Sequence, residues 1–270
     1  MQAMLVQADR MASLGLLAAG VVHEVNTPLA YILSNLDWLD EELPALRQQL
    51  SGPAGADGGT GSLVQRLETV ESTLRDIRQG AERVRDIARD VKTFARSSDD
   101  TSMLVDLREV LDAALKMALV NIRYRARVVR DYQDVPLVRA NEARLAQVFL
   151  NLVVNAAQAI PEDGCEHEIR VRLWTGPNGE ACASVEDTGL GIPAENMAHL
   201  FEPFFTTKAA GEGTGLGLFI CKSILETFDG SITVDSRPGE GTTFRLALPP
   251  HVSASRAAMP LEEPASAVAQ

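Results

Sequence analysis

A histidine and a glutamate stand side by side inside the apolar stretch VVHEVNTPL, at residues 21–29. A neutral imidazole can act as a nucleophile, and a carboxylate that accepts the proton of its second nitrogen orients the ring and stabilises its charged form. The zinc-protease pattern H-E-x-x-H is excluded because Thr27 occupies the second histidine position. At about 100° per residue, His23 lies about 200° from Val21 and Val25, so we expect it to be exposed rather than structural.

Two further stretches carry polar groups that could bind a ligand. RLAQVFLNLVVNAAQAI places Asn151 and Asn155 four residues apart, on one face of an expected helix. Either amide could instead be a cap or a satisfied buried group. VEDTGLGIP ends a strand with Asp187, before Gly189 and Gly191, which allow a close backbone approach. A buried carboxylate at that point could accept a hydrogen bond from an exocyclic amine.

Aromatic and glycine-rich residues follow, in LFEPFFTTK and GEGTGLGLFICKSILETF. The first contributes Lys208, and the second leads into a helix whose N-terminal N–H groups suit an anion. Its residues of interest are Gly213, Thr214, Gly215, Leu216 and Gly217. The P-loop lysine is missing. A loose dinucleotide-binding match is rejected because Pro193 and the aromatic stretch leave no room for a Rossmann helix and strand.

Two long segments with apolar residues every three or four positions precede these stretches. Their positions are Leu14, Ala18, Val21, Val25, Leu29, Ile32, Leu36, Leu39 and Leu43, then Leu63, Leu67, Val70, Leu74, Ile77, Ala81, Val84, Ala88, Val91 and Ala95. The spacing predicts two helices joined by a flexible glycine-rich connection at 51–62. Each helix buries one face, so we expect a dimeric four-helix bundle; packing against the rest of the chain is the alternative.

The pattern changes after residues 97–100 to shorter mixed elements. We expect strands near 103–106, 127–132, 137–139, 169–174, 182–186, 231–236 and 242–248, with helices ending near 123, 160 and 228. The predicted parts are a helical hairpin at 1–98, an α/β domain at 99–250 and a disordered tail at 251–270. Residues 97–100 are the expected hinge between the first two parts.

The composition limits the partners and the compartment. The formal net charge of −12 argues against nucleic acid and anionic membrane surfaces as partners. Cys165, Cys182 and Cys221 lack C-x-x-C spacing, which favours reduced thiols and a cytoplasmic location. No run approaches the roughly 20 apolar residues of a spanning helix, so we expect no membrane span in this chain, which could still be part of a longer or membrane-linked sensor.

In their order along the chain, these stretches resemble the H, N, G1, F and G2 boxes of the sensor histidine kinases, and GEGTTFRLALP resembles the G3 element. The resemblance covers roughly residues 11–249. It implies an α-helical hairpin followed by an α/β sandwich that binds ATP, a fold shared with gyrase, heat-shock chaperone and mismatch-repair ATPases. The implied activity is autophosphorylation of His23 and transfer of the phosphoryl group to an aspartate of a response regulator, with phosphatase activity as an additional possibility.

The resemblance also implies a role for each matching residue of the nucleotide domain. Asn155 would hold Mg²⁺ beside the ATP phosphates, and Asn151 would support that metal and phosphate site. Asp187 would read the adenine amino group, and Lys208 would reach a phosphate oxygen. The remaining positions would shape the pocket or edge a short lid between residues 208 and 213: Gly189, Gly191, Gly213, Thr214, Gly215, Leu216 and Gly217.

In the H box, the resemblance makes His23 the nucleophile and Glu24 its orienting carboxylate. Thr27 would orient a water that dephosphorylates the regulator, or is simply a helix threonine beside a proline. Asn26 would contact the phosphoryl group or tolerate the bend that Pro28 introduces. An ATP-binding scaffold without phosphotransfer is the alternative function. A motor-like ATPase is disfavoured because Asn151 stands where such enzymes carry a catalytic glutamate.

Overall fold

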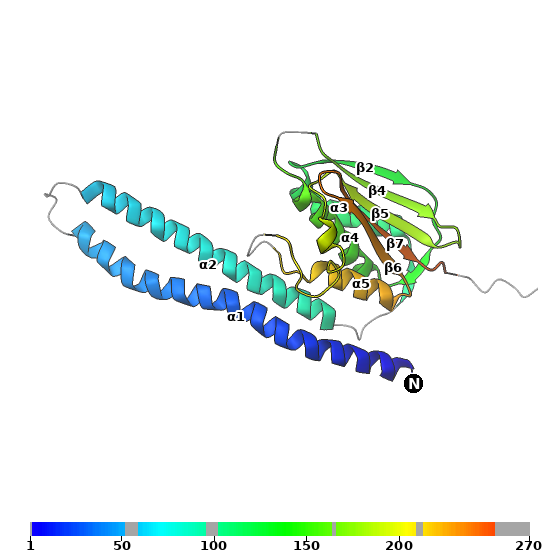
Figure 1. Ribbon diagram of the computed structural model, residues 1–270, viewed down its shortest axis with the longest axis horizontal. Coiled ribbons are helices and arrows are strands. Elements are labelled where there is room, and N and C mark those ends of the chain that lie inside the picture. The colour runs from blue at the N-terminus through cyan, green and yellow to red at the C-terminus, as the bar shows by residue number, and fades with distance from the viewer. Residues whose placement is uncertain (1, 52–58, 96–101, 164–165, 209–212, 252–270) are drawn as a thin grey trace, which may run out of the picture. The chain divides into compact units, whose positions relative to one another are not determined.

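The computed structural model describes residues 2–51, 59–95, 102–163, 166–208 and 213–251 (Figure 1). The expected hinge at 97–100, the short lid and the predicted tail beyond residue 251 therefore lie wholly or largely outside the described residues. The chain divides into two compact units. One contains residues 1–100, 191–224 and 236–240, and the other contains residues 101–190, 225–235 and 241–270.

Two long helices form the predicted hairpin. They are α1 (Gln2–Ser51) and α2 (Gly59–Ala95). Helix α2 begins inside the expected connection, and α1 is continuous through Pro28 and Pro44. A small apolar cluster joins the helices, consisting of Leu39, Leu46 and Val70 with Trp38, Leu63 and Ile77 packed against it. The helical periodicity thus identified both elements correctly.

The apolar seam of the hairpin is only partly buried within one chain. Leu36 and Leu43 of α1 are 43% and 49% exposed, and Leu67 and Leu74 of α2 are 48% and 52% exposed. Meanwhile Ile87, which the predicted seam omitted, is fully buried. The seam residues therefore divide between an intrachain contact and an apolar stripe on the surface of the single chain.

Two ion pairs link the helices of the hairpin across their interface. Arg66 pairs with Glu42, and Arg83 Nη2 lies 2.7 Å from Glu24 Oε2. Between them, a Cβ on Gly80 would lie 3.0 Å from a side-chain carbon of Ile32, so the absence of a side chain at Gly80 allows the helices to approach closely. These contacts fix an antiparallel register in which Glu24 faces Arg83.

The α/β part of the chain contains a five-stranded sheet in the order β2-β4-β5-β7-β6 (Figure 1). Its strands are β2 (Arg127–Tyr132), β4 (Glu168–Thr175), β5 (Ala181–Asp187), β6 (Ser231–Arg237) and β7 (Gly241–Leu248). β2 and β4 are parallel, whereas β4–β5 and β5–β7 are antiparallel. A second, two-stranded antiparallel sheet pairs β1 (Met103–Val105) with β3 (Val138–Ala140).

Helices α3 (Leu107–Ile122) and α4 (Glu142–Ala159) cover one face of the five-stranded sheet (Figure 1). Asp106 caps α3 by accepting a hydrogen bond from the Arg108 N–H, and Asn141 caps α4 by accepting from the Arg144 N–H. Alternate residues of β4 are buried, as a half-covered strand requires. Two shorter helices complete the elements, η1 (Ala194–Asn196), which was not predicted, and α5 (Gly217–Thr227).

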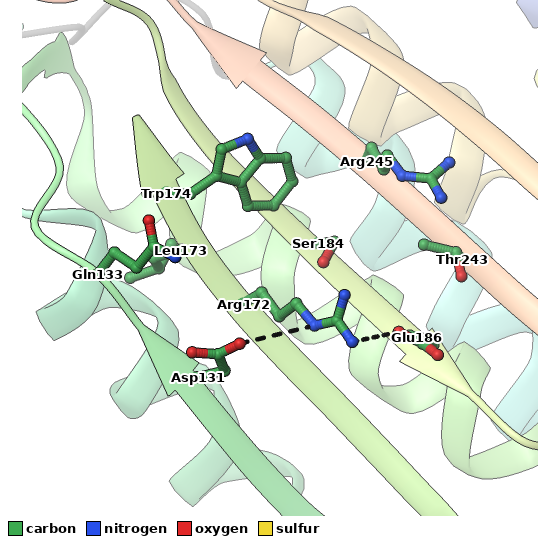
Figure 2. A pocket seen from close by; sticks show the side chains of 9 residues that line it. All are labelled: Asp131, Gln133, Arg172, Leu173, Trp174, Ser184, Glu186, Thr243 and Arg245. Carbon is green, nitrogen blue, oxygen red and sulfur yellow. Dashed lines mark ion pairs between the residues drawn. The ribbon is translucent and has the colours of Figure 1, made fainter. Parts of the chain in front are cut away.

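The other face of the sheet carries polar side chains around a shallow hollow of about 300 Å³ (Figure 2). Arg172 lies between Asp131 and Glu186, at 3.9 Å and 3.5 Å respectively. None of the residues predicted to bind nucleotide lines this hollow. Its mixed charges show no preference for a phosphate-bearing ligand, so the candidate site must be built from other residues.

Candidate active site

His23 is exposed on α1, as its position relative to the apolar seam predicts. The Thr27 hydroxyl donates a hydrogen bond to the His23 carbonyl oxygen at 3.0 Å, a common bond of a threonine to its own helix. Asn26 is also exposed. The hairpin therefore presents an imidazole, an amide and a hydroxyl on accessible positions of a continuous helix, and the imidazole is the strongest nucleophile of the three when a ring nitrogen is unprotonated.

Glu24 is held by the opposite helix. Its Oε2 accepts a hydrogen bond from Arg83 Nη2 at 2.7 Å, and both side chains are largely shielded from solvent. Side chains of consecutive helix residues point about 100° apart, so the carboxylate lies against α2 while His23 remains exposed. The sequence pattern did not identify Arg83. In an antiparallel hairpin, the ends of the two helices alone place Glu24 within about one helical turn of Arg83. The predicted helix bounds could therefore have pointed to this residue.

Asp187 ends β5, the central strand of the sheet, where it pairs with Ile169 of β4 and Thr242 of β7. The residue is 4% exposed, and burial raises its pKa to about 6, although the backbone N–H groups of Gly189 and Thr242 oppose the shift by donating to the carboxylate. The Gly189 N–H lies 2.9 Å from Oδ1. The prediction of a buried carboxylate at this strand end is confirmed.

The turn after Asp187 packs directly against the end of α4. The Leu190 N–H donates to the Ala159 carbonyl oxygen at 3.0 Å, and a Cβ on Gly189 would lie only 2.5 Å from that oxygen. Gly241 of β7 packs even more closely, because a Cβ there would lie 1.9 Å from the Asp187 carbonyl oxygen. Glycine is therefore required for backbone packing at both positions, whatever Gly189 contributes to a ligand.

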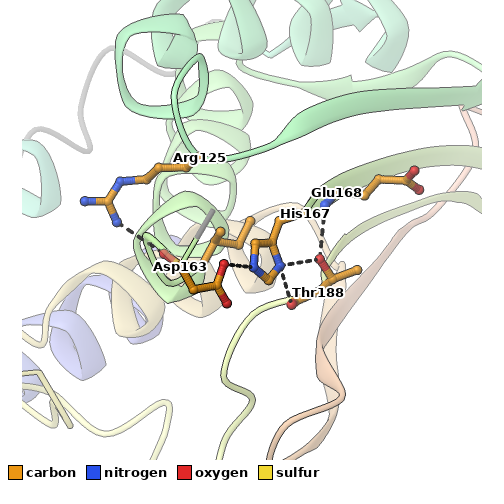
Figure 3. A network of polar contacts seen from close by, with 6 residues as sticks. Arg125, Asp163, His167, Glu168 and Thr188 are labelled. Atoms are coloured by element: carbon orange, nitrogen blue, oxygen red, sulfur yellow. Dashed lines mark hydrogen bonds and ion pairs between the residues drawn. The ribbon is translucent and has the colours of Figure 1, made fainter. Parts of the chain in front are cut away.

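A polar network fixes Thr188, the residue between Asp187 and Gly189 (Figure 3). His167 Nδ1 lies 3.1 Å from the Thr188 carbonyl oxygen and 3.2 Å from its hydroxyl, which also accepts a hydrogen bond from the Glu168 N–H at 3.0 Å. On its other side, His167 Nε2 lies 3.1 Å from Asp163 Oδ1. No motif pointed to this network, because the pairing of β4 with β5 is what brings Thr188 to His167 and Glu168.

Asn151 and Asn155 lie one turn apart on α4, both half-buried. The same helix ends at Ala159, and the turn after Asp187 packs against that end. Helix α4 therefore holds the two amides and the Asp187 carboxylate in one compact unit. Among the described residues, no cluster of three or more His, Cys, Asp or Glu side chains could hold a metal ion. Two amide oxygens nevertheless suit Mg²⁺, which prefers oxygen ligands and retains waters and phosphate oxygens.

The remaining predicted positions lie in the other compact unit. A Cβ on Gly213 would lie 3.4 Å from Lys208 Cδ, and Gly215, with φ of +67°, lies against the backbone of Phe204. The Thr214 hydroxyl accepts from the Leu216 N–H at 3.3 Å, just before α5 begins at Gly217.

Gly191 and Gly215 are the two predicted positions with left-handed backbone. Gly191 has φ of +68°, and a Cβ there would lie 2.0 Å from the Arg237 carbonyl oxygen. Both glycines therefore combine a conformation that other residues avoid with a close backbone approach. The side chain of Lys208 thus lies beside the start of the glycine-rich segment in this unit.

Comparison with known proteins identifies the family. Residues 140–252 match the family of histidine kinase-, DNA gyrase B-, and HSP90-like ATPases. Sensor kinase CckA of Brucella abortus (strain 2308) is 32% identical over 94% of this chain and 26% of its own length. Signal transduction histidine-protein kinase AtoS of Escherichia coli (strain K12) is 33% identical over 92% of this chain and 37% of its own length. This chain thus spans less than half of each of these two relatives.

A solved structure agrees with the fold. Acinetobacter baumannii histidine kinase AdeS matches 85% of this chain and 98% of its own, with a TM-score of 0.52 and 18% sequence identity. At that identity the likeness shows the fold alone, a helical region followed by an α/β domain. The matched ATPase family and the two relatives that align along nearly the whole sequence show that the chain carries the catalytic core of a sensor histidine kinase.

Proposed function

We propose that this chain uses ATP to phosphorylate its own His23 and passes the phosphoryl group to an aspartate on the receiver domain of a response regulator. The observation that carries the proposal is an exposed histidine on a two-helix hairpin, joined in one chain to a domain of an ATP-binding family. An exposed imidazole is accessible both to a nucleotide and to a protein substrate, which a two-step transfer requires.

Adenine recognition is assigned to Asp187. The ionised carboxylate accepts a hydrogen bond from the exocyclic amino group, and the Gly189 N–H, which already donates to Oδ1, keeps the carboxylate oriented. Burial makes that charge costly in the empty site, so a ligand donor that replaces water is favoured there. Gly191 supports the same pocket by allowing the chain to turn after Asp187.

Phosphate binding is assigned to α4 and to the segment before α5. Asn155, supported by Asn151, would hold Mg²⁺, which neutralises charge on the phosphates when bound. Lys208 would contact a phosphate oxygen. The lid positions Gly213, Thr214, Gly215, Leu216 and Gly217 would border the triphosphate, where the backbone N–H groups at the start of α5 suit an anion.

Phosphoryl transfer requires an unprotonated ring nitrogen on His23. That nitrogen attacks the γ-phosphorus, the nitrogen–phosphorus bond forms, and the bond to the bridging oxygen breaks so that ADP leaves. The ring becomes positively charged, and the Glu24 carboxylate stabilises it by accepting a hydrogen bond from the N–H of the other ring nitrogen. Asn26 would contact the phosphoryl group, and Thr27 would orient a water when the regulator is dephosphorylated.

A second copy of the chain is the proposed partner of the hairpin. The exposed leucines of α1 and α2 form the apolar stripe that a dimeric four-helix bundle would cover, and burying them removes apolar surface from water.

We also propose a domain boundary and hinge near residues 97–100. The catalytic reaction is assigned to the cytoplasm, where ATP is available. Among the described residues, none of the helices combines the length and apolar character needed to cross a bilayer.

Labelling with γ-labelled ATP and Mg²⁺ tests the proposal. The wild-type chain should acquire a label that is stable in alkali and lost in acid, and the His23→Gln variant should acquire none. ATP affinity is measured in parallel for both proteins. Nucleotide binding without label in the wild type would replace the kinase with an ATP-responsive scaffold.

A further inference from the structure

The Glu24–Arg83 pair joins the residue next to the proposed nucleophile to the opposite helix. The side chains of Arg83 and Glu24 are only 19% and 25% exposed. In the part of the chain that is described, Arg83 Nε is buried without a hydrogen-bond partner. A guanidinium that has lost much of its hydration needs its carboxylate partner, because an unpaired charge there would be costly. The pair is therefore a persistent contact rather than a loose surface contact.

Glu24 also lies at a point where α1 lacks one of its own backbone hydrogen bonds. Pro28 has no N–H, so the Glu24 carbonyl oxygen lacks the donor that a helix normally supplies four residues later. A glutamate side chain has several rotatable bonds, and fixing it in one position has an entropic cost. Contacts from α2 can compensate for both losses, and Arg83 is the residue that supplies one.

We propose that Arg83 is a positioning residue for phosphotransfer, which holds the Glu24 carboxylate at the level of His23. The inference rests on the proposed kinase function. Arg83 donates to Oε2, which leaves Oε1 as the oxygen that meets the N–H of the His23 ring when the imidazole turns toward it. One carboxylate thus bridges the guanidinium of α2 and the imidazole of α1. Without Arg83, the carboxylate samples other orientations and stabilises the charged ring less often.

The hairpin supplies its own control. Arg66 and Glu42 form a second ion pair between the same helices, and their side chains are 26% and 19% exposed. This pair lies about five helical turns along α1 from His23. If such pairs only stabilise the hairpin, Arg66→Met and Arg83→Met should change the rate of His23 phosphorylation by similar factors. If Arg83 positions Glu24, only Arg83→Met should lower that rate.

The experiment measures the rate of His23 labelling in the full chain over a range of ATP concentrations. Arg83→Met should lower the rate at saturating ATP about tenfold, a fraction of what a positioned acid–base group typically contributes. The ATP concentration at half-maximal rate should stay within about twofold, because Arg83 does not touch nucleotide in this account. Arg83→Lys should lose only about threefold, since one donor remains, and Arg66→Met should lose less than twofold.

A double-mutant cycle tests whether Arg83 acts through Glu24. In a Glu24→Gln background, Arg83→Met should cause less than about a twofold further loss, because the carboxylate that it positions is already absent. Thermal unfolding by circular dichroism verifies that each variant is folded. If Arg83→Met does not fold, the comparison of Arg83→Lys with Arg66→Lys replaces it, with the same threefold loss expected for Arg83→Lys alone.

Several results would overturn the inference. Equal losses for the Arg66 and Arg83 variants would show a structural role, and a full further loss in the Glu24→Gln background would show that Arg83 acts independently of Glu24. A raised half-saturating ATP concentration would instead place Arg83 in nucleotide binding. A wild-type chain that binds ATP without being labelled would overturn the proposed function, a result distinguishable from all of these.

Discussion

The hairpin and the sheet prepare their chemical groups in opposite ways. His23 stands exposed on a continuous helix, and Glu24 beside it is oriented by a side chain from a second helix. Asp187 is buried at the end of a central strand, and the groups around it are mainly backbone N–H and carbonyl groups of glycine-containing turns. Substitutions beside His23 should therefore change the phosphorylation rate. Substitutions around Asp187 should change both the free energy of unfolding and the affinity for ATP.

The largest expected effect is that of Gly189→Ala. The added methyl group would lie 2.5 Å from the Ala159 carbonyl oxygen, so the Asp187 turn must move away from α4. We expect a loss of about 2–4 kcal/mol in the free energy of unfolding and no measurable ATP binding. Urea denaturation and calorimetric titration with ATP measure the two quantities.

Gly239→Ala is the matched control. Gly239 has φ of +79° but no atom within 4 Å of an added Cβ, so the substitution introduces backbone strain without a clash. It should cost about 1–2 kcal/mol and leave ATP binding intact. Equal effects of the two alanines on ATP binding would show that close packing at Gly189 does not shape the site.

Asp187→Asn should weaken ATP binding while stabilising the empty protein. Losing a hydrogen bond to a charged group should weaken affinity roughly tenfold to a hundredfold. Because the folded-state pKa of Asp187 is about 6, above the 3.8 of an ordinary aspartate, ionisation of this group opposes folding at neutral pH. Its stabilising contribution is complete below about 3.8 and is lost as the pH rises through about 6.

The wild type should therefore be less stable than Asp187→Asn at pH 8, by on the order of 3 kcal/mol at most, and the difference should shrink toward pH 4. Thermal unfolding of both proteins between those pH values measures the difference. Asp134→Asn, which removes a fully exposed carboxylate, is the control for the loss of one surface charge. A difference that stays constant with pH would contradict the assignment of a raised pKa to Asp187.

Leu36→Gln should weaken dimerisation about tenfold or more without altering helix content. Leu36 is 43% exposed in one chain, and a twofold-symmetric bundle would bury it twice. Sedimentation equilibrium measures the dissociation constant. Met117→Gln, at a similarly exposed apolar residue of α3, should leave it unchanged, and equal dissociation constants for all three proteins would argue against the proposed bundle.

The smallest effect is expected from His167→Ala. Removing the ring frees Thr188 from its contact with His167 and loosens the turn that carries Asp187, so ATP affinity should fall about threefold to tenfold. His199→Ala is the control, because His199 is exposed and its Nδ1 lies 3.0 Å from Glu202 Oε1, in an ion pair at the surface. Equal titration curves for the wild type and His167→Ala would remove His167 from the site.

Local patterns predicted most elements of both regions. The strand predicted at 127–132 coincides with β2, and the helix predicted to end near 160 ends at Ala159, because hydrophobic periodicity and helix-breaking residues are local signals. The short helix η1 was missed because it has no apolar period. The apolar period of the hairpin could not separate the intrachain contact from the exposed stripe, since both follow the same spacing.

The residues of the candidate site also divide into those that local patterns predict and those that they do not. Glycine-rich motifs and the position of Asp187 at a strand end were visible in the sequence, and so was the exposure of His23. Arg83 and His167 were not, because their partners lie 59 and 21 residues away along the chain. Contacts of this kind depend on helix register and strand pairing, which only the folded chain defines.

The most direct test of the central claim is to locate the transferred phosphate. After incubation with ATP and Mg²⁺, the wild-type chain is digested at neutral or alkaline pH, and mass spectrometry assigns the modified residue. We predict phosphorylation of His23 alone, absent in His23→Gln and strongly reduced in Asp187→Asn. Phosphate on another residue, or none on a protein that demonstrably binds ATP, would contradict the account.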